Sequence, residues 1–171
     1  MKSLEYPSGK QIIRQLQMAG VRFVVSLPDI VTSSGLLWPI ARNNDFELIR
    51  VCKEDEGVSI CAAMSYNGTR AVLLMQQTGL MDSLNSIRAL AMDYQLPVVM
   101  MVGLQGKEPE PVPEQSSVYG VRIIPSVLEA MSVSFSLVQE PSDAFTIQDR
   151  IGSCYADSKP HVFLIGRTPI E

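Results

Sequence analysis

Residues 53–68, KEDEGVSICAAMSYNG, decide how this chain is expected to fold. A mostly apolar run, Leu48–Cys52, ends just before the acidic stretch Glu54–Glu56, and small, uncharged side chains follow as far as Gly68. This order is typical of a buried strand followed by a helix, and acids are favoured in a first helical turn by the helix dipole. The small side chains would allow this helix to lie close against its neighbours.

Glu56 is the acid that leads directly into the uncharged part of this helix. A carboxylate that faces an apolar surface is partly desolvated, which is useful for proton chemistry. A solvated acidic helix cap is the ordinary interpretation of the same residue. This stretch alone leaves both interpretations open.

A second stretch repeats the arrangement of strand and helix. Residues 71–80, AVLLMQQTGL, form a buried-strand run that ends in polar residues and a glycine. Residues 81–87, MDSLNSI, then open another helix, for which Asp82 or Ser83 would serve as an ordinary N-cap.

Together, residues 54–90 resemble the pyrimidine-binding (PYR) domain of thiamine-diphosphate enzymes. They are most similar to sulfopyruvate decarboxylase alpha subunits and to the N-terminal half of phosphonopyruvate decarboxylases. Those proteins carry an E-G-V-G-I-like helix start, then G-K-R and a strand that ends L-M-Q-N-S-G-L-G-N. The resemblance extends more weakly over nearly the whole chain.

The resemblance implies a catalytic and cofactor-binding role for Glu56, which matches the family's Glu-Gly pair together with Gly57. In the family this glutamate hydrogen-bonds the aminopyrimidine ring of thiamine diphosphate and activates the cofactor. The resemblance also implies that the loop near the pyrimidine is formed by residues Gln77, Thr78, Gly79 and Leu80.

Two further stretches can be compared with the family pattern: one departs from it and the other resembles it. The family's usual L-G-N reads Leu80-Met81-Asp82 here, which puts the conformation of this loop in question. Pro28 and Asp29 resemble the family's G-V-P-D-S loop, where the acid lies at the active site, so they are candidate substrate-binding residues. An ordinary turn residue is the alternative for Asp29.

Thiamine enzymes hold the diphosphate through Mg²⁺ with a G-D-G…N motif on a second, pyrophosphate-binding (PP) domain. This sequence contains no G-D-G. We therefore expect no metal ligand from this chain, and we expect thiamine diphosphate to be shared with a PP-domain beta subunit that holds Mg²⁺. A hetero-oligomer is implied, or a homo-oligomer if the chain is isolated, with a small 2-oxo acid such as 3-sulfopyruvate or 3-phosphonopyruvate as substrate. Cations for such an anion would come from the partner or from Arg22, Arg70 or Arg122.

Composition limits the class of protein. The chain has 171 residues, of which 46% are hydrophobic and 19% charged, and a net charge of −4 argues against a nucleic-acid partner. The N-terminal residues 1–7 contain no apolar signal region and the apolar runs are strand-sized, so the expectation is a cytoplasmic protein with no membrane segment. Three cysteines without a C-x-x-C pair fit reduced thiols.

The pattern along the chain predicts one domain, residues 1–171, with a three-layer α/β/α fold and a mainly parallel six-stranded sheet. Predicted strands alternate with predicted helices, and they cover residues 21–26, 46–52, 71–76, 98–102, 134–138 and 161–166. The carboxyl ends of such strands gather on one edge of a sheet, where ligands bind. We interpret His161, at the start of the last predicted strand, as structural.

Residues 103–119 interrupt the alternation with a loop rich in proline and acid. Such loops tend to be functional or mobile, and we expect this one to bury little. The leading interpretation is thus a decarboxylase subunit. A non-catalytic regulatory or binding module that retains the PYR fold is the alternative, and a flavodoxin- or receiver-like domain is a third possibility.

Overall fold

The computed structural model describes residues 5–170; Met1–Leu4, part of the N-terminal stretch judged to lack a signal region, lie outside this range. Within it, six strands form one parallel sheet in the order β2-β1-β3-β4-β6-β5. The strands are β1 Phe23–Ser26, β2 Glu47–Arg50, β3 Ala71–Gln76, β4 Val99–Gly103, β5 Ser134–Val138 and β6 His161–Ile165. The six-stranded parallel sheet predicted from the sequence is confirmed.

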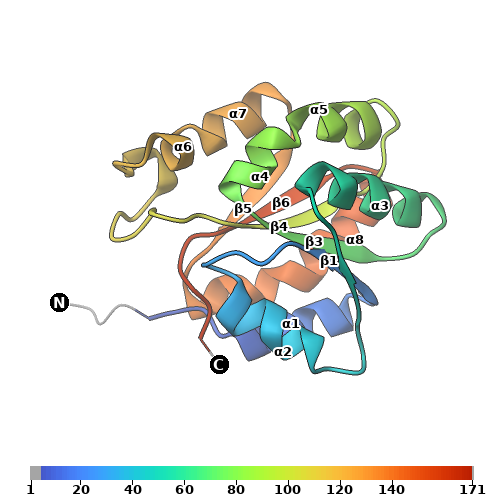
Figure 1. Cartoon of the computed structure of the whole chain (residues 1–171), viewed down its shortest axis with the longest axis horizontal. Helices are drawn as coiled ribbons and strands as arrows, with labels where there is room; N and C mark the ends of the chain where they lie inside the picture. Colours follow the sequence, from blue (N-terminus) through green and yellow to red (C-terminus); the bar gives the residue numbers. More distant parts are fainter. Residues whose placement is uncertain (1–4, 171) are drawn as a thin grey trace.

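Helices cover both faces of this sheet, as the continuous apolar runs of the central strands require (Figure 1). One face carries α1 Gly9–Met18, the π-helix η1 Ser33–Leu37, α2 Trp38–Ala41, the 3-10 helix η4 Pro141–Thr146 and α8 Ile147–Asp157. The other face carries α3 Glu54–Tyr66, α4 Gln77–Asp82, α5 Leu84–Ser86, the π-helix η2 Ile87–Met92, the 3-10 helix η3 Pro113–Gln115, α6 Tyr119–Arg122 and α7 Ile124–Ala130. Each face has its own apolar core against the sheet.

The helix that was predicted to open at residues 81–87 begins earlier in the structure. The helical segment begins already at Gln77 and divides into α4, α5 and η2. Gln76 is still extended, with φ −91° and ψ 161°, so the chain passes from strand to helix without an intervening loop. α4 continues through Met81 and Asp82, so the family's glycine at position 81 is not needed to form this helix.

Gly57 allows α3 to approach the sheet closely. A Cβ at this position would lie 2.5 Å from Leu73 Cδ1 in β3, well inside van der Waals contact. Gly57→Ala is therefore expected to lower the free energy of unfolding by about 1–2 kcal/mol, because overpacking outweighs the gain in helix propensity. Urea denaturation followed by circular dichroism measures this change.

Gly152→Ala in α8 is the matched control, because nothing lies within 4 Å of a Cβ built at Gly152. This helical glycine should stabilise the protein by about 0.5–1 kcal/mol when replaced. Equal effects of the two substitutions would contradict the close packing of α3 on β3.

His161 is buried at the start of β6, at the edge of the sheet opposite the strands' carboxyl ends. Its Nδ1 lies 2.8 Å from Ser134 Oγ and its Nε2 lies 3.0 Å from Ser136 Oγ, both on β5. Burial lowers the pKa of His161 to about 4, and the charge of Arg150 adds to this. These contacts agree with the structural interpretation of His161.

Stability should therefore fall as the pH is lowered. The folded pKa lies below the unfolded value of 6.5, so the unfolded state takes up the proton first and the stability present above pH 6.5 is lost toward pH 4. We expect a loss of about 2 kcal/mol between pH 7 and pH 5. Because the chain has a single histidine, NMR titration of its ring resolves the folded pKa directly. A folded pKa above 6 would contradict this prediction.

Candidate functional site

The topology brings four chain segments together at the carboxyl edge of the sheet. β1 and β3 are neighbours, but the chain leaves β1 toward β2 on one side and leaves β3 toward β4 on the other. A parallel α/β sheet opens a crevice at such a point, and ligands bind there. These segments follow β1, β2, β3 and β4, and the first three carry the candidate residues Asp29, Glu56 and Thr78.

Glu56 occupies the third position of α3, as expected from the sequence. Its Oε2 accepts hydrogen bonds from the backbone N–H groups of Cys52 (2.9 Å) and Lys53 (3.2 Å), which is one half of a capping box. Within residues 5–170 its other oxygen, Oε1, makes no hydrogen bond. The carboxylate is therefore held in place by one oxygen and presents the other.

Of the two interpretations left open for Glu56, this chain alone supplies the solvated helix cap and not the desolvated carboxylate. Its side chain is exposed at the start of α3, and the apolar residues of the helix face the sheet instead. Any low-dielectric surroundings for this carboxylate would have to come from a bound molecule or another chain.

Gln77, Thr78, Gly79 and Leu80, the predicted cofactor loop, form the first turn of α4 rather than a loop. The Gln77 side chain is buried: its Nε2 donates to Gln105 O (3.2 Å) and its Oε1 accepts from Gln105 N–H (3.0 Å). This pair ties the ends of β3 and β4 together. Leu80 is fully buried, whereas Thr78 is exposed and its Oγ1 accepts from Gln76 Nε2 (3.1 Å). Contact of Gln77 or Leu80 with a cofactor stays a prediction, and it would be made through the backbone.

Asp29 organises the segment that follows β1. Its Oδ1 accepts from the backbone N–H groups of Val31 (2.7 Å) and Thr32 (2.9 Å), and its Oδ2 accepts from the Thr32 hydroxyl. Asp29 also packs against Gly103, the last residue of β4. These bonds are those of a turn residue, while Pro28 beside it is exposed. A substrate contact for either residue stays a prediction.

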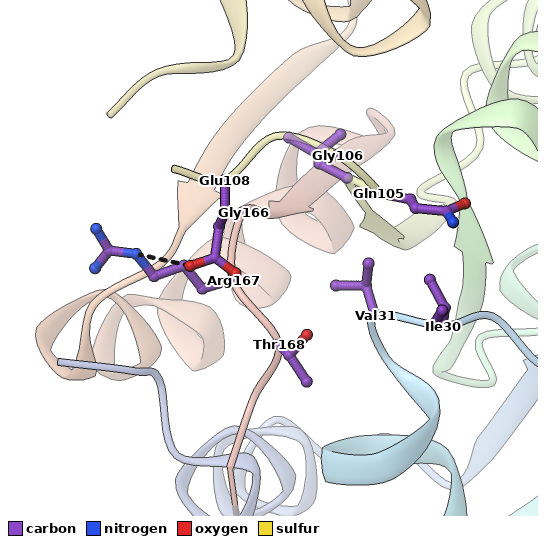
Figure 2. Close-up of a pocket in the computed structure, with 9 residues that line it drawn as sticks. Ile30, Val31, Gln105, Gly106, Glu108, Gly166, Arg167 and Thr168 are labelled. Carbon is purple, nitrogen blue, oxygen red and sulfur yellow. Dashed lines mark ion pairs between the residues drawn. The ribbon is translucent and has the colours of Figure 1, made fainter. Parts of the chain in front are cut away.

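A small pocket of about 190 Å³ opens between the segments after β1, β4 and β6 (Figure 2). Ile30 and Val31 line one side, and the other walls are formed by Leu104, Gln105, Gly106, Glu108, Gly166, Arg167 and Thr168. Glu108 Oε1 lies 3.9 Å from Arg167 Nε, and Figure 2 shows the guanidinium directed away from the pocket. The residues after β6 were missed by the sequence reasoning, although the rule about carboxyl ends applies equally to that strand.

Among residues 5–170, Lys107 and Arg167 are buried cations at this edge. Lys107 Nζ donates to Gln139 Oε1 (2.5 Å), and Arg167 Nη1 donates to the carbonyl oxygens of Glu5 (3.0 Å) and Gln139 (3.2 Å). Burial, and then the charge of Arg167, lower the pKa of Lys107.

The expectation that the loop 103–119 buries little is wrong at five of its positions. These are Gly103, Leu104, Lys107, Pro113 and Ser116, all of which are buried. Ser116 Oγ donates to Gly106 O (2.9 Å), and Gln139 Nε2 donates to Pro111 O (3.1 Å). The loop is thus attached to the domain at several points.

Of the three arginines considered as ligands for an anionic substrate, two lie away from the carboxyl edge of the sheet. Arg22 and Arg70 flank the amino-terminal ends of β1 and β3, where Arg22 pairs with Glu47 and Arg70 donates to Ala19 O (2.6 Å). Arg122 donates to Ser116 O (2.9 Å) and so supports the loop 103–119. The expectation is corrected for Arg22 and Arg70: the strand polarity that locates Glu56 at the site places them at the opposite edge.

Within residues 5–170, no group of three or more His, Cys, Asp or Glu side chains is placed to hold a metal ion. In the same range, no helix has the length and apolarity needed to span a bilayer. Cys52, Cys61 and Cys154 are free thiols, and only Cys52 is exposed.

A solved structure shares the architecture of this chain. A 2-oxoglutarate:ferredoxin oxidoreductase from Magnetococcus marinus superposes with a TM-score of 0.70 over 99% of this chain and 30% of that chain, at 16% identity. This likeness concerns the fold alone, which is a three-layer α/β/α arrangement with a parallel six-stranded sheet, as predicted. No protein-family model matches the sequence.

Several curated relatives are similar to this chain over most of its length. The chain is 25% identical to a sulfopyruvate decarboxylase of Methanosarcina acetivorans over 157 residues, which are 91% of this chain and 39% of that protein. It is 24% identical to the sulfopyruvate decarboxylase subunit alpha of Methanococcus maripaludis and 26% identical to that of Methanothermobacter thermautotrophicus. These two matches cover 82% of this chain, and 82% and 84% of the respective subunits. The relatives support the family indicated by the sequence, that of the sulfopyruvate decarboxylase alpha subunits.

Proposed function

We propose that this chain is the PYR-domain (alpha) subunit of a thiamine-diphosphate-dependent 2-oxo-acid decarboxylase that acts on 3-sulfopyruvate or 3-phosphonopyruvate. The observation that carries the proposal is the geometry of Glu56. Its carboxylate stands at the crevice of the sheet, anchored through Oε2 by two backbone N–H groups. The family resemblance and the named relatives support the same function.

The residues present fit the pyrimidine end of thiamine diphosphate. Glu56 Oε1 is free to share a proton with a ring nitrogen, and the first turn of α4 is part of the same edge of the sheet. When bound, the cofactor would supply a nucleophilic carbanion and accept the electrons released as the 2-oxo acid loses CO₂. The task of Glu56 would be to hold a proton between its carboxylate and the ring.

Mg²⁺ and the diphosphate are proposed to be held by a PP-domain beta subunit. The α3–α7 face leaves more apolar side chains partly exposed than the opposite face, among them Ile60, Met64 and Met81. An apolar pocket of about 330 Å³ beside α3 is lined by Phe23, Ile60 and Met64. That pocket lies toward the end of α3, so a partner that extends from it along this face to the start of the helix would also enclose Glu56, and burial there would supply the desolvation that this chain lacks.

Co-expression with a short protein that carries a G-D-G motif tests the proposed function. The purified complex should release CO₂ from 3-sulfopyruvate or 3-phosphonopyruvate only when thiamine diphosphate and Mg²⁺ are present. A stable complex that decarboxylates neither 2-oxo acid would overturn the proposal and favour a non-catalytic module.

A further inference from the structure

The strand β5, Ser134–Val138, forms one edge of the sheet, and its outer side is open. Its residues pair with β6, and apart from β6 and Gly166 just after it, no described residue forms a hydrogen bond with the β5 backbone. Four of its five side chains are at least partly exposed, whereas every residue of β6 is buried. An edge strand of this kind is a template for pairing with another chain.

The two edges of the sheet differ in how they are protected. The opposite edge strand, β2, begins with Glu47 and ends with Arg50, and Glu47 forms an ion pair with Arg22. Charges on an edge strand oppose its pairing with another chain. By contrast, residues 131–139, MSVSFSLVQ, contain no charge, proline or glycine. β5 therefore lacks the charges and prolines with which monomeric proteins protect a sheet edge.

The side chains of β5 are complementary to those of a second β5 in antiparallel orientation. A two-fold axis beside Ser136 pairs the whole strand: Ser136 then faces Ser136 of the second copy, and Phe135 faces the second copy's Leu137. Phe135 and Leu137 are partly buried residues that pack against the apolar core on the α7 face. Each would gain an apolar neighbour across the axis, and such cross-strand pairs stabilise a sheet.

Opposite charges lie at the two ends of this edge. Glu140, two residues beyond β5, is exposed and still extended, with φ −122° and ψ 158°. Lys159 is exposed two residues before His161, which is the β6 residue that pairs with Ser134. Neither Glu140 nor Lys159 belongs to an ion pair formed within residues 5–170. In the antiparallel arrangement, continuing the register by two residues places Glu140 of one copy roughly 10 Å, or two strand spacings, from Lys159 of the other. The alternation of side chains places both on the same face, so the two long side chains can meet.

We propose that β5 is the surface through which two copies of this chain form a two-fold dimer, with the two β5 strands antiparallel and paired about Ser136. This contact joins the two six-stranded sheets into one. It does not rest on the proposed function. The strands β4 and β6 separate β5 from β3, beyond which lie the segments that carry Glu56 and Thr78. A PP-domain partner placed against α3 is therefore compatible with this dimer.

Crosslinking in a Cys52→Ser background tests both the dimer and its register. This background removes the exposed thiol and leaves the buried Cys61 and Cys154. With oxidised glutathione as the oxidant, Ser136→Cys should form a disulfide-linked dimer in most of the protein. Opposed residues of antiparallel strands have Cα atoms about 4.5–5.5 Å apart, which a disulfide can span. Ser134→Cys is the matched control, because it also removes one hydroxyl partner of His161, but its two copies would lie about 14 Å apart. It should give at most about a tenth as much linked dimer.

Sedimentation velocity measures the dimer without a crosslink. The mass of the wild-type chain should rise with concentration from 18.8 kDa toward twice that value. Glu140→Lys and Lys159→Glu should each raise the dissociation constant of the dimer about tenfold, because each replaces attraction by repulsion at both ends of the contact. The double variant should return it to within about threefold of wild type. Asp45→Lys, at an exposed acid before the opposite edge strand β2, is the control and should leave it within about twofold.

Four other outcomes would each overturn the inference. A wild-type chain that stays monomeric at every concentration would show that β5 is only an exposed edge. Equal crosslinking of Ser136→Cys and Ser134→Cys would contradict the register. A dimer that none of the charge variants weakens would be formed through another surface. Amide hydrogen exchange of residues 134–138 that slows only when a PP-domain partner is added would assign this edge to that partner.

Discussion

Replacing Glu56 with Gln is expected to lower the turnover of the assembled enzyme by about a thousandfold while the chain still folds and assembles. Gln retains an oxygen that can accept from the N–H groups of Cys52 and Lys53, so the capping box survives. It cannot share a proton with a ring nitrogen as a carboxylate does, and loss of such proton transfer costs about 10²–10⁴-fold. Exchange of the C2 proton of bound thiamine diphosphate, followed by NMR, measures the affected step directly.

Asp55→Asn is the matched control, since it removes a charge from the same helical turn and keeps an oxygen that accepts from Glu56 N–H. Its turnover should stay within about threefold of wild type. Near wild-type C2 exchange in Glu56→Gln would return Glu56 to the role of a helix cap.

The sheet could be predicted because its physical signal is local. The central strands β3, β4 and β6 are short apolar runs bounded by polar residues, and burial on both faces produces that pattern. The division of residues 77–92 into α4, α5 and η2 has no such signal. The break between α4 and α5 falls at Ser83, which is neither a proline nor a glycine. Ser83 is buried, and its hydroxyl has no hydrogen-bond partner in the described structure. Tertiary packing, rather than local sequence, sets that break.

In the candidate site, too, some features follow from local sequence and others only from the folded chain. The position of Glu56 at a helix start follows from a strand and an acidic turn that are adjacent in sequence. The bonds between Gln77 and Gln105 join segments that only the folded chain brings together. Lys107 was expected in an exposed loop because it is surrounded by prolines and acids, yet a single partner, Gln139 Oε1, accompanies its full burial.

The second large effect is expected from removing the partner: the isolated chain should bind thiamine diphosphate about a thousandfold more weakly than the complex and should be inactive. The cofactor has two ends of different chemistry, and in the proposed function Glu56 and the first turn of α4 would contact only the pyrimidine. The diphosphate requires Mg²⁺ held by oxygen ligands, and within residues 5–170 no cluster of acidic or other metal-binding side chains provides them. A thousandfold loss corresponds to roughly 4 kcal/mol, a plausible contribution for a metal-held diphosphate.

Titration calorimetry with thiamine diphosphate, with and without Mg²⁺, separates the contributions of the two chains. The complex should bind tightly and only with Mg²⁺, whereas the isolated chain should give the same weak signal in both conditions, because its own residues cannot use the metal. The Glu56→Gln complex is the informative control: it should retain Mg²⁺-dependent binding, since the diphosphate anchor is proposed to lie on the partner. Tight, Mg²⁺-dependent binding by this chain alone would show that it carries a metal site of its own, and the division of the cofactor between two chains would then be wrong.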